Sequence, residues 1–390
     1  MSITEASKKY HERMFPGYKS KFLETDPEFI ERFDNFAFDE VVNSDDLDDR
    51  TRMMAILATL IGSQSVDEFR AMVPAALNFG VTPVEVKEIV YQAVAYLGIG
   101  RVFPCLHIVN DILTERGIKL PLEPQATTTI ENRLEAGEKT MIDIMGESMR
   151  GFAESGPEES RHINKWLTDN CFGDYYTRKG LDYKQREMIT FCFLAAQGGC
   201  EPQLTSHAMN NMMVGNDKAF LIKVVSQCLP FIGYPRSLNA LNCVNAASDK
   251  MKEAETKPEN PGAFPMGDKL PEAFSKYFVG QAYLQTLTDK GGPISNVTFE
   301  PGCRNNWHIH HKGGQILLVT GGKGWYQAWG EPAQELHPGD VVDIPAEVKH
   351  WHGAAADSWF SHLAVEIPAE GGFAEWLEAV SDEEYSKLGK

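Results

Sequence analysis

Two short motifs between Gly302 and Ala354 decide the fold of the C-terminal part of the chain. They read Gly302-x5-His308-x-His310-x4-Gln315-x6-Gly322 and Gly339-x5-Pro345-x4-His350-x3-Ala354. Side chains alternate between the two faces of a strand, so His308 and His310 point the same way. Two imidazoles on one face can hold a divalent ion. Gln315 could add an oxygen ligand, and we expect His350 to return on a later strand as the fourth ligand.

The alternative is that these histidines are solvated surface residues. Seven of the eleven histidines fall between His308 and His362, which favours one common site. Strand alternation over residues 361–367 predicts that His362 faces the metal cavity without binding the ion. His352 lies two residues after His350 and shares its face. Both His352 and His362 could act as general bases near neutral pH, or could instead orient ligands or lie outside the site.

Aromatic residues near the motifs are expected to line a pocket. Trp307 and Trp325 would supply apolar walls suited to a small organic ligand. A metal ion in such a pocket can polarise a carbonyl or hydroxyl oxygen. The motifs therefore predict a small-molecule substrate.

Composition indicates a globular chain of two or three domains. The sequence has 390 residues, of which 43% are hydrophobic, enough for ordinary cores. The net charge is -18, with 55 acidic residues against 37 basic ones. Because no cluster of Lys and Arg stands ready to neutralise phosphates, we expect no nucleic-acid partner.

The sequence also carries signals of cellular location. Its N-terminal residues do not combine basic residues with an apolar stretch, as a secretory signal would. The longest apolar run, residues 53–61, is too short to span a bilayer. Seven widely spaced cysteines, an odd number, do not suggest a disulfide framework. We therefore expect a reduced, cytoplasmic protein without a membrane segment.

The first 256 residues show the apolar periodicity of helices. The string at residues 82–85 (TPVE) is typical of a helix start, with Thr as N-cap and Glu three residues later. The pattern repeats after about 135 residues, with the matched pairs Gly80 and Gly215, Gln92 and Gln227, Tyr96 and Phe231, Gly98 and Gly233, and Arg101 and Arg236. Two copies of one helical unit are therefore predicted.

The expected architecture is two all-α repeats followed by an antiparallel β-barrel. The first helical repeat spans residues 1–122 and the second spans residues 123–256. The barrel spans residues 264–370. For the acidic tail, residues 371–390, we expect one helix that packs over Trp376.

The helical repeats resemble the carboxymuconolactone decarboxylase family. The strings that carry the resemblance are residues 74–83 (PAALNFGVTP) and 232–241 (IGYPRSLNAL). Members of this family are all-helical and form rings of several subunits, which implies a homo-oligomer. Fused pairs of such units would still leave apolar faces to cover, such as the face of Ala55 and Thr59 and the face of Met209 and Met213.

The second repeat also resembles the related alkylhydroperoxidase D-like proteins. These use a Cys-x-x-Cys-x-x-x-His relay with an upstream Glu, to which Cys200, His207 and Glu187 correspond. Gln203 stands at the second Cys position, so a local dithiol relay is disfavoured. Cys200 and His207 are two helical turns apart and share a face if one helix holds both. An imidazole beside the thiol would then favour the thiolate.

Other roles are open at the second repeat. Glu187 and His207 could act as a general acid–base pair, and Arg236 could hold a substrate carboxylate. The alternative is that His207 and Cys200 only pack the bundle. The first repeat has methionines at the positions of Glu187 and His207, so we interpret that copy as mostly structural.

The C-terminal motifs resemble those of the cupin superfamily, a small antiparallel barrel with a metal at its centre. Residues 337–342 (HPGDVV) and 349–355 (KHWHGAA) are similar to the small cupins that include manganese-dependent hydroxynitrile lyases. The resemblance implies acid–base roles for His352 and His362, and manganese as the ion, with iron or zinc as alternatives. The ligands it implies are His308, His310, Gln315 and His350.

One departure from those small cupins is an extra residue between His310 and Gln315, where His311 is inserted. The insertion could displace Gln315, or it could offer His311 as a competing ligand.

Three functions from different classes are consistent with these patterns. The first is a metal-dependent lyase or decarboxylase for a small oxygenated carboxylate or lactone. The second is an alkylhydroperoxidase-like redox protein that acts through Cys200, which predicts a reactive thiol of low pKa. The third is a non-catalytic cupin that binds a ligand on a helical oligomerisation platform. The acid–base residues beside the metal motif favour the first.

Overall fold

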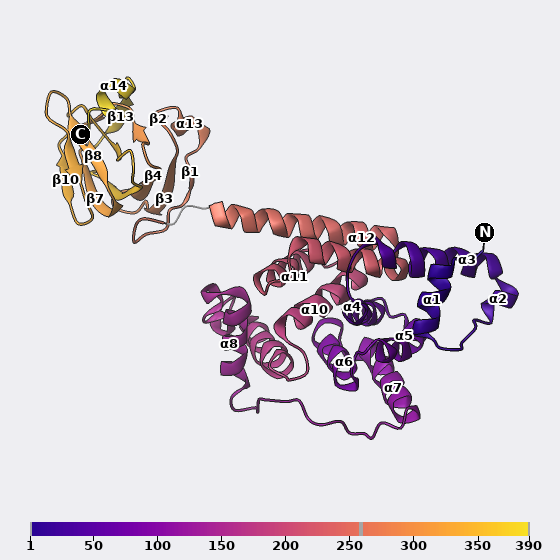
Figure 1. Cartoon of the computed structure of the whole chain (residues 1–390). Coiled ribbons are helices and arrows are strands. Elements are labelled where there is room, and N and C mark those ends of the chain that lie inside the picture. The colour runs from indigo at the N-terminus through magenta and orange to yellow at the C-terminus, as the bar shows by residue number, and fades with distance from the viewer. Residues whose placement is uncertain (1, 257–259, 389–390) are drawn as a thin grey trace. The chain divides into compact units, whose positions relative to one another are not determined.

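The computed structural model describes residues 2–256 and 260–388. It divides into two compact units, Met1–Thr256 and Lys257–Lys390, and each is described by itself. Figure 1 shows the first unit as helices throughout and the second as strands with two short helices. The expected class, all-α repeats followed by an antiparallel β domain, is confirmed. Within the described part of the chain, none of the helices has the length and apolarity needed to cross a membrane.

The first repeat begins with three helices that cover the ones that follow. The 3-10 and π-helical turns in the chain carry the symbol η. The elements are α1 (Glu5–Met14), α2 (Phe22–Thr25), α3 (Pro27–Asn35), η1 (Phe36–Glu40), η2 (Val42–Ser44), α4 (Asp49–Gly62), α5 (Val66–Asn78), α6 (Pro83–Leu97) and α7 (Ile99–Glu115). The predicted start of α6 is present, because Thr82 and Glu85 form a reciprocal capping box.

The second repeat has the same order of core helices. The elements are α8 (Arg133–Met145), η3 (Glu147–Met149), η4 (Phe152–Glu154), α9 (Arg161–Trp166), η5 (Leu167–Tyr176), α10 (Tyr183–Gln197), α11 (Glu201–Met213) and α12 (Lys218–Thr256). Gly233 interrupts α12 with a positive φ of 74°, and its counterpart Gly98 separates α6 from α7 with a φ of 77°. Glycine adopts this backbone conformation without a Cβ clash, so it marks the same break in both repeats.

The two repeats pack together as a pseudo-dimer around α4 and α10. Nε of Arg52 donates to Oε1 of Gln227 at 2.9 Å, and Nη1 of Arg186 donates to Oε1 of Gln92 at 2.7 Å. Each repeat thus supplies the arginine that meets the other repeat's glutamine. All four side chains are buried, so these reciprocal bonds hold the two halves in register.

The pseudo-dimer corrects one expectation about subunit contacts. Ala55 and Thr59 were expected on an apolar face left for other subunits, but both are buried inside this unit. Oγ1 of Thr59 lies 3.0 Å from Sγ of Cys228 in the second repeat. This face is covered within the chain because the second repeat packs on it. The homo-oligomer itself stays a prediction.

The second unit is built from short antiparallel strands. They are β1 (Asp268–Lys269), β2 (Phe278–Val279), β3 (Ala282–Thr288), β4 (Ile294–Phe299), β5 (Arg304–Asn305), β6 (His308–His311), β7 (Gln315–Gly322), β8 (Gly324–Ala328), β9 (Gln334–Leu336), β10 (Val341–Ile344), β11 (His350–Ala354), β12 (Phe360–Glu366) and β13 (Phe373–Trp376), with helices α13 (Glu272–Ser275) and α14 (Asp382–Tyr385).

The strands form two sheets around one apolar core. One sheet has the order β1-β3-β4-β12-β7-β10, and the other has β13-β6-β11-β5-β2 with β8 and β9 beside β11. The core includes Phe299, Leu317, Ile344 and Phe360. Burial alternates along β7, as expected for a strand with one face inside. Both sheets therefore point one set of side chains into the barrel.

The expected helix over Trp376 is wrong. Residues 373–376 form strand β13, which pairs with β6 so that Trp376 lies opposite His308. The indole of Trp376 stacks on the His308 ring, with ring centres 4.6 Å apart. Without β13, the outer edge of β6 would leave its backbone groups unpaired. Among the described residues of the tail, only the short helix α14 follows.

Candidate metal centre and a second polar site

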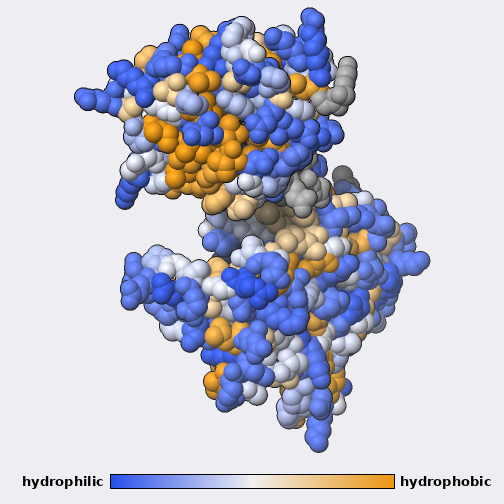
Figure 2. Space-filling model, turned by 90° about the vertical axis from the view of Figure 1, so that its left-hand side faces the viewer, coloured by the Kyte–Doolittle hydropathy of each residue, from blue (hydrophilic) through white to orange (hydrophobic). Residues whose placement is uncertain are grey.

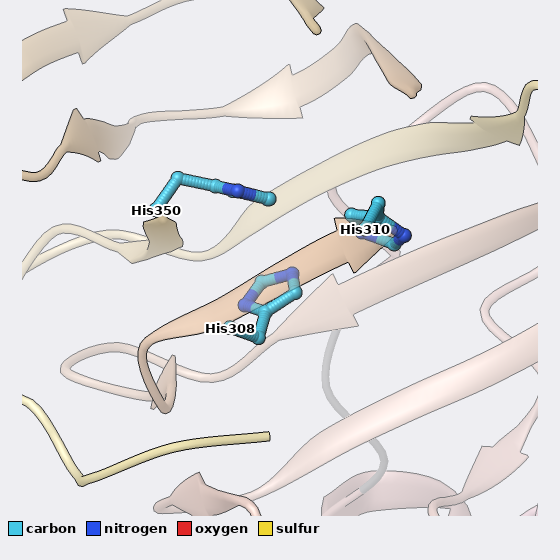
Figure 3. A group of neighbouring side chains, drawn as sticks. All are labelled: His308, His310 and His350. Atoms are coloured by element: carbon cyan, nitrogen blue, oxygen red, sulfur yellow. The ribbon is translucent and has the colours of Figure 1, made fainter. Parts of the chain in front are cut away.

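Three histidines converge inside the barrel. His308 and His310 lie on β6, and His350 starts β11 directly opposite His308 in the antiparallel pairing. Figure 3 shows the three rings turned toward one another from these two strands. One ligand nitrogen from each lies within 4.8 Å of the others, and all three residues are buried. This spacing suits a single divalent ion.

The hydrogen bonding of these rings fits a set of metal ligands. Nδ1 of His308 and Nδ1 of His350 each lie 3.0 Å from a backbone oxygen, of Asn306 and Val348, to which they donate. Nε2 of His310 and Nε2 of His350 are buried without a hydrogen-bond partner. Burial lowers the pKa of His308 well below its usual value and that of His350 to about 4. Neutral imidazoles with a fixed tautomer are the form that binds metals.

Gln315 offers a fourth ligand atom to the same place. Its Oε1 is buried and has no hydrogen-bond partner. Its Nε2 donates to Oε1 of Glu366 at 2.5 Å, while Oε2 of Glu366 lies 3.3 Å from Nδ1 of His310. Burial favours the neutral acid, but hydrogen bonds from His310 and Gln315 lower the pKa of Glu366 overall. One carboxylate therefore orients two of the four candidate ligands.

Sequence reasoning assigned no role to Glu366. Strand alternation placed it on the face of His362, but its partners come from β6 and β7, which only the folded sheet brings beside β12. A carboxylate four residues after a candidate base was the signal that could have found it.

The inserted His311 does not compete for the site. Its Nδ1 donates to Oε2 of Glu347 at 2.6 Å, and its Nε2 lies 2.8 Å from Oε2 of Glu375. Lys312 has a positive φ of 69° at the turn that follows, so the turn accommodates the extra residue. Gln315 therefore keeps its place beside the three histidines.

A cavity of about 440 Å³ opens beside these ligands. Small-molecule sites commonly have this size. Its walls are mainly apolar, and three of its large apolar residues, Phe274, Ile367 and Phe373, are also exposed. Figure 2 shows apolar side chains gathered on the face of the barrel that is turned to the viewer. The polar residues of the wall are Ser295, Asn305, His308, His310, His311, Gln315, His352 and Glu366.

The predicted tryptophan walls are wrong. Trp307 and Trp325 belong to a separate apolar cluster with Trp351 and Val380, and neither borders the cavity. Trp307 directly precedes His308 in sequence, so it points to the opposite side of the backbone. Phe278 and Trp376 line the cavity instead.

The two histidines expected to act as bases occupy different positions. His352 borders the cavity, whereas His362 is fully buried behind it and does not. Nε2 of His362 lies 3.2 Å from Nδ1 of His352, and Nε2 of His352 lies 3.0 Å from Nδ2 of Asn305. Burial lowers the pKa of His362 to about 4, so its ring is neutral at pH 7. The expectation that His362 faces the cavity is therefore revised, and His352 holds that position.

A second group of polar side chains lies in the helical unit. Nδ1 of His207 donates to Oε2 of Glu187 at 2.7 Å, and the hydroxyl of Tyr176 donates to Oε1 of the same carboxylate at 2.9 Å. The hydroxyls of Thr190 and Tyr96 lie 3.0 and 2.9 Å from the Tyr176 hydroxyl. Burial raises the pKa of Tyr176 and Tyr96 well above its usual value, so both phenols stay protonated. The expected pairing of Glu187 with His207 is present.

Cys200 does not share a helix with His207. Cys200 has non-helical backbone angles and caps α11, which begins at Glu201. Its Sγ lies 3.5 Å from the backbone oxygen of Leu194, and burial raises the pKa of its thiol. The expected low-pKa thiolate is therefore not favoured. Arg236 is half-buried beside Gly198, and its contact with a substrate stays a prediction.

Comparison with known proteins agrees with both parts of this architecture. The model of the carboxymuconolactone decarboxylase family matches residues 27–111 and 162–246, and the cupin domain model matches residues 295–365. The protein thus belongs to a class in which one chain contains a helical pseudo-dimer and a histidine-lined barrel. The chain therefore carries two repeats of the carboxymuconolactone decarboxylase family, followed by a cupin domain.

Three relatives illustrate the two parts. The chain is 42% identical to an (R)-mandelonitrile lyase of Granulicella tundricola over 115 residues, 28% of this chain and 87% of the relative. It is 29% identical to a 4-carboxymuconolactone decarboxylase of Acinetobacter baylyi over 103 residues, 25% of this chain and 77% of the relative. A solved cupin-like protein from Thermotoga maritima is 44% identical, with a TM-score of 0.31, covering 33% of this chain and 98% of that one. These names agree with a lyase or decarboxylase type of family.

Proposed function

We propose that the barrel is a metal-dependent lyase centre that acts on a small oxygenated substrate. The observation that carries the proposal is the set of buried ligand atoms without partners on His310, Gln315 and His350, beside an apolar cavity. Buried polar atoms are rarely left unpaired, so a ligand of the protein is expected there. The 42% identity to an (R)-mandelonitrile lyase supports a lyase.

His308, His310, Gln315 and His350 would hold the ion. We propose manganese first, because the motifs resemble those of manganese-dependent cupins, with iron or zinc, which imidazole ligands also suit, as alternatives. When bound, the ion would supply Lewis-acid polarisation of a carbonyl or hydroxyl oxygen.

The lining of the cavity narrows the substrate class. None of the described residues that line it is Lys or Arg, whereas the carboxylate of Glu366 does line it. A charged carboxylate substrate would therefore meet a negative group. Apart from the ion and His311, whose two ring nitrogens already face Glu347 and Glu375, it would meet no cationic group. Among the expected classes, this favours a lactone or another neutral oxygenated molecule, such as a hydroxynitrile, with an apolar body against Phe278 and Trp376.

His352 is the residue we propose as the proton acceptor. It borders the cavity, and its Nε2 would take the proton of a substrate hydroxyl in place of its contact with Asn305. Its Nδ1–H would then donate to Nε2 of His362, a neutral ring that can accept this bond. His362 would orient His352 and stabilise its charged form, so His362 acts through His352.

The test is turnover of mandelonitrile and of small lactones by the metal-loaded protein. His352→Ala should lower the rate by about 10²- to 10⁴-fold, the usual effect of losing a general base. His362→Ala should lower it less, and His362→Gln, which keeps an acceptor, should recover part of the loss. The exposed His337 serves as a control, because its ring is hydrogen-bonded to Glu335 and does not line the cavity. Full activity in His352→Ala would contradict the assignment, and binding without turnover would favour a non-catalytic cupin.

The Glu187–His207 pair is a second candidate centre, for acid–base decarboxylase chemistry. The observation that favours it is the 2.7 Å bond between a fully buried carboxylate and a ring that is 13% exposed. The redox alternative has less support, since Cys200 lacks both a second sulfur at Gln203 and an imidazole partner.

A further inference from the structure

A second cavity, of about 400 Å³, lies in the helical unit and shares no lining residue with the Glu187 network. Residues of α6 form one wall and Asn110 of α7 lies beside them. The segment 120–125 and Arg178, which follows η5, complete it. Its lining combines charged residues of α6 and Arg178 with an apolar wall, and the exposed Glu123 and the half-buried Gln125 of the segment also border it.

Lys87 is the unusual residue of this cavity. Only 7% of it is exposed, yet its Nζ donates to the amide oxygen of Asn110, a neutral partner. The ring of Tyr91 lies below it, with its centre 5.9 Å from Nζ. Within residues 2–256, no carboxylate lies within ion-pair distance of Lys87. A buried ammonium without an anion is costly, so the fold leaves a positive charge to be compensated.

The nearby acid cannot supply that compensation. Glu88 is buried and already pairs with two guanidinium groups, those of Arg178 and Arg186. Arg178 binds Glu88 through Nε and Nη2, so its Nη1 is not used in this pair, and Arg178 lines the cavity. Two cationic groups therefore face this cavity, while the one buried carboxylate between them is fully used.

We propose that this cavity binds a small organic carboxylate. The carboxylate pairs with Nζ of Lys87 and accepts from Nη1 of Arg178. The organic body lies against the apolar wall made by Val84, Leu120, Pro121, Leu122 and Pro124. This wall favours an organic anion over inorganic phosphate, which would leave it uncovered.

The site belongs to one repeat only. At the 135-residue shift, Lys87 corresponds to Ile222 and Tyr91 to Ser226, so the second repeat lacks both the charge and the ring. One carboxylate per chain is therefore expected at this cavity.

The test is calorimetric binding of benzoate to the full chain, after the metal is removed with a chelator that is then dialysed away. This step keeps benzoate from binding an ion in the barrel. Benzamide serves as the neutral isostere and inorganic phosphate as the compact anion. Wild type should bind benzoate and should bind benzamide and phosphate at least about tenfold more weakly, because a charge-assisted bond is lost or the apolar wall stays bare.

Lys87→Met keeps the shape of the side chain and removes its charge. It should weaken benzoate binding by about 10- to 100-fold. Lys139→Met removes an exposed lysine that pairs with Asp143 and should change nothing. Lys87→Gln, which also removes the charge, is a second variant with the same expected direction if Lys87→Met does not fold. Absence of benzoate binding to wild type, equal binding of benzamide, or unchanged binding by a folded Lys87→Met would each overturn the proposal.

Discussion

The two candidate centres differ in how their buried polar atoms are satisfied. In the helical unit, both oxygens of Glu187 accept hydrogen bonds, from Tyr176 and His207. In the barrel, His310, Gln315 and His350 each keep a buried atom without a partner. Buried atoms without partners also occur in the helical unit, on Asp169 and Arg186, but they do not belong to a group of three ligand side chains. The convergence of three buried histidines on one point therefore favours the barrel as the ligand site more than unpaired atoms alone do.

The two helical repeats add a second contrast. The matched arginine–glutamine pairs occur in both, so they serve the fold. The polar network around Glu187 joins Tyr96 of the first repeat to residues of the second. At the equivalent place around Met53, apolar counterparts border a small cavity of about 10 Å³. Those counterparts of Tyr176, Glu187, Thr190, His207 and Tyr96 are Val42, Met53, Ile56, Met72 and Phe231. A scaffold that tolerates methionine at both positions does not need Glu187 and His207 for folding.

Of the changes considered, metal removal should produce the largest difference in stability between the two units. A bound ion stabilises the barrel by about 2.7 kcal/mol when free metal is ~100 times its Kd, and chelation removes that stabilisation. The helical unit, which has no group of three metal-ligand side chains among its described residues, should unfold as before.

The tryptophans make this measurement direct. Six of the seven lie at residues 307–376, so intrinsic fluorescence reports the barrel, and far-ultraviolet circular dichroism reports the helices. Urea unfolding with and without chelator should shift the fluorescence transition alone. If chelation shifted the circular-dichroism transition of the helices by the same urea concentration, the two units would not differ in their dependence on the metal.

Glu366→Gln should weaken metal binding without emptying the site. The substitution removes the charge that orients His310 and Gln315, and loss of such a partner costs about 10- to 100-fold in metal affinity. Competition with a calibrated chelator measures this affinity. Glu335→Gln, a substitution on the barrel surface, is the matched control. Unchanged affinity in Glu366→Gln would mean that the ligands are oriented by the backbone alone.

The single substitution Glu187→Met should lower the free energy of unfolding more than the double substitution Glu187→Met and His207→Met does. The single substitution leaves the hydroxyl of Tyr176 and Nδ1 of His207 short of an acceptor, at about 1–3 kcal/mol of unfolding free energy. The double variant reproduces the pair found in the first repeat and should recover most of that loss. Chemical denaturation measures all three proteins. Additive losses in the double variant would contradict the idea that the pair is dispensable for folding.

The sequence predicted those features of the fold and the site that depend on the periodicity of residues along one strand or helix. Alternation placed His308 and His310 on one face, and the shift of 135 residues paired Gly98 with Gly233. The same alternation places Trp307 opposite His308, so its wrong assignment to the cavity was avoidable.

Features that depend on contacts between distant segments were not predictable. Glu366 meets Gln315 only because β12 pairs with β7, and Tyr96 meets Tyr176 only because the two repeats pack together. The strand at residues 373–376 also escaped prediction, since four residues carry too little periodicity and the free edge of β6 decides their conformation.

The metal content of the purified protein tests the central claim most directly. Elemental analysis of wild type should find about one divalent ion per chain, and His337→Ala should retain it. The double substitution His308→Ala and His350→Ala removes two of the three buried imidazoles and should bring the content close to zero while the helical unit stays folded. The same metal content in the double variant as in wild type would contradict the barrel as the metal centre.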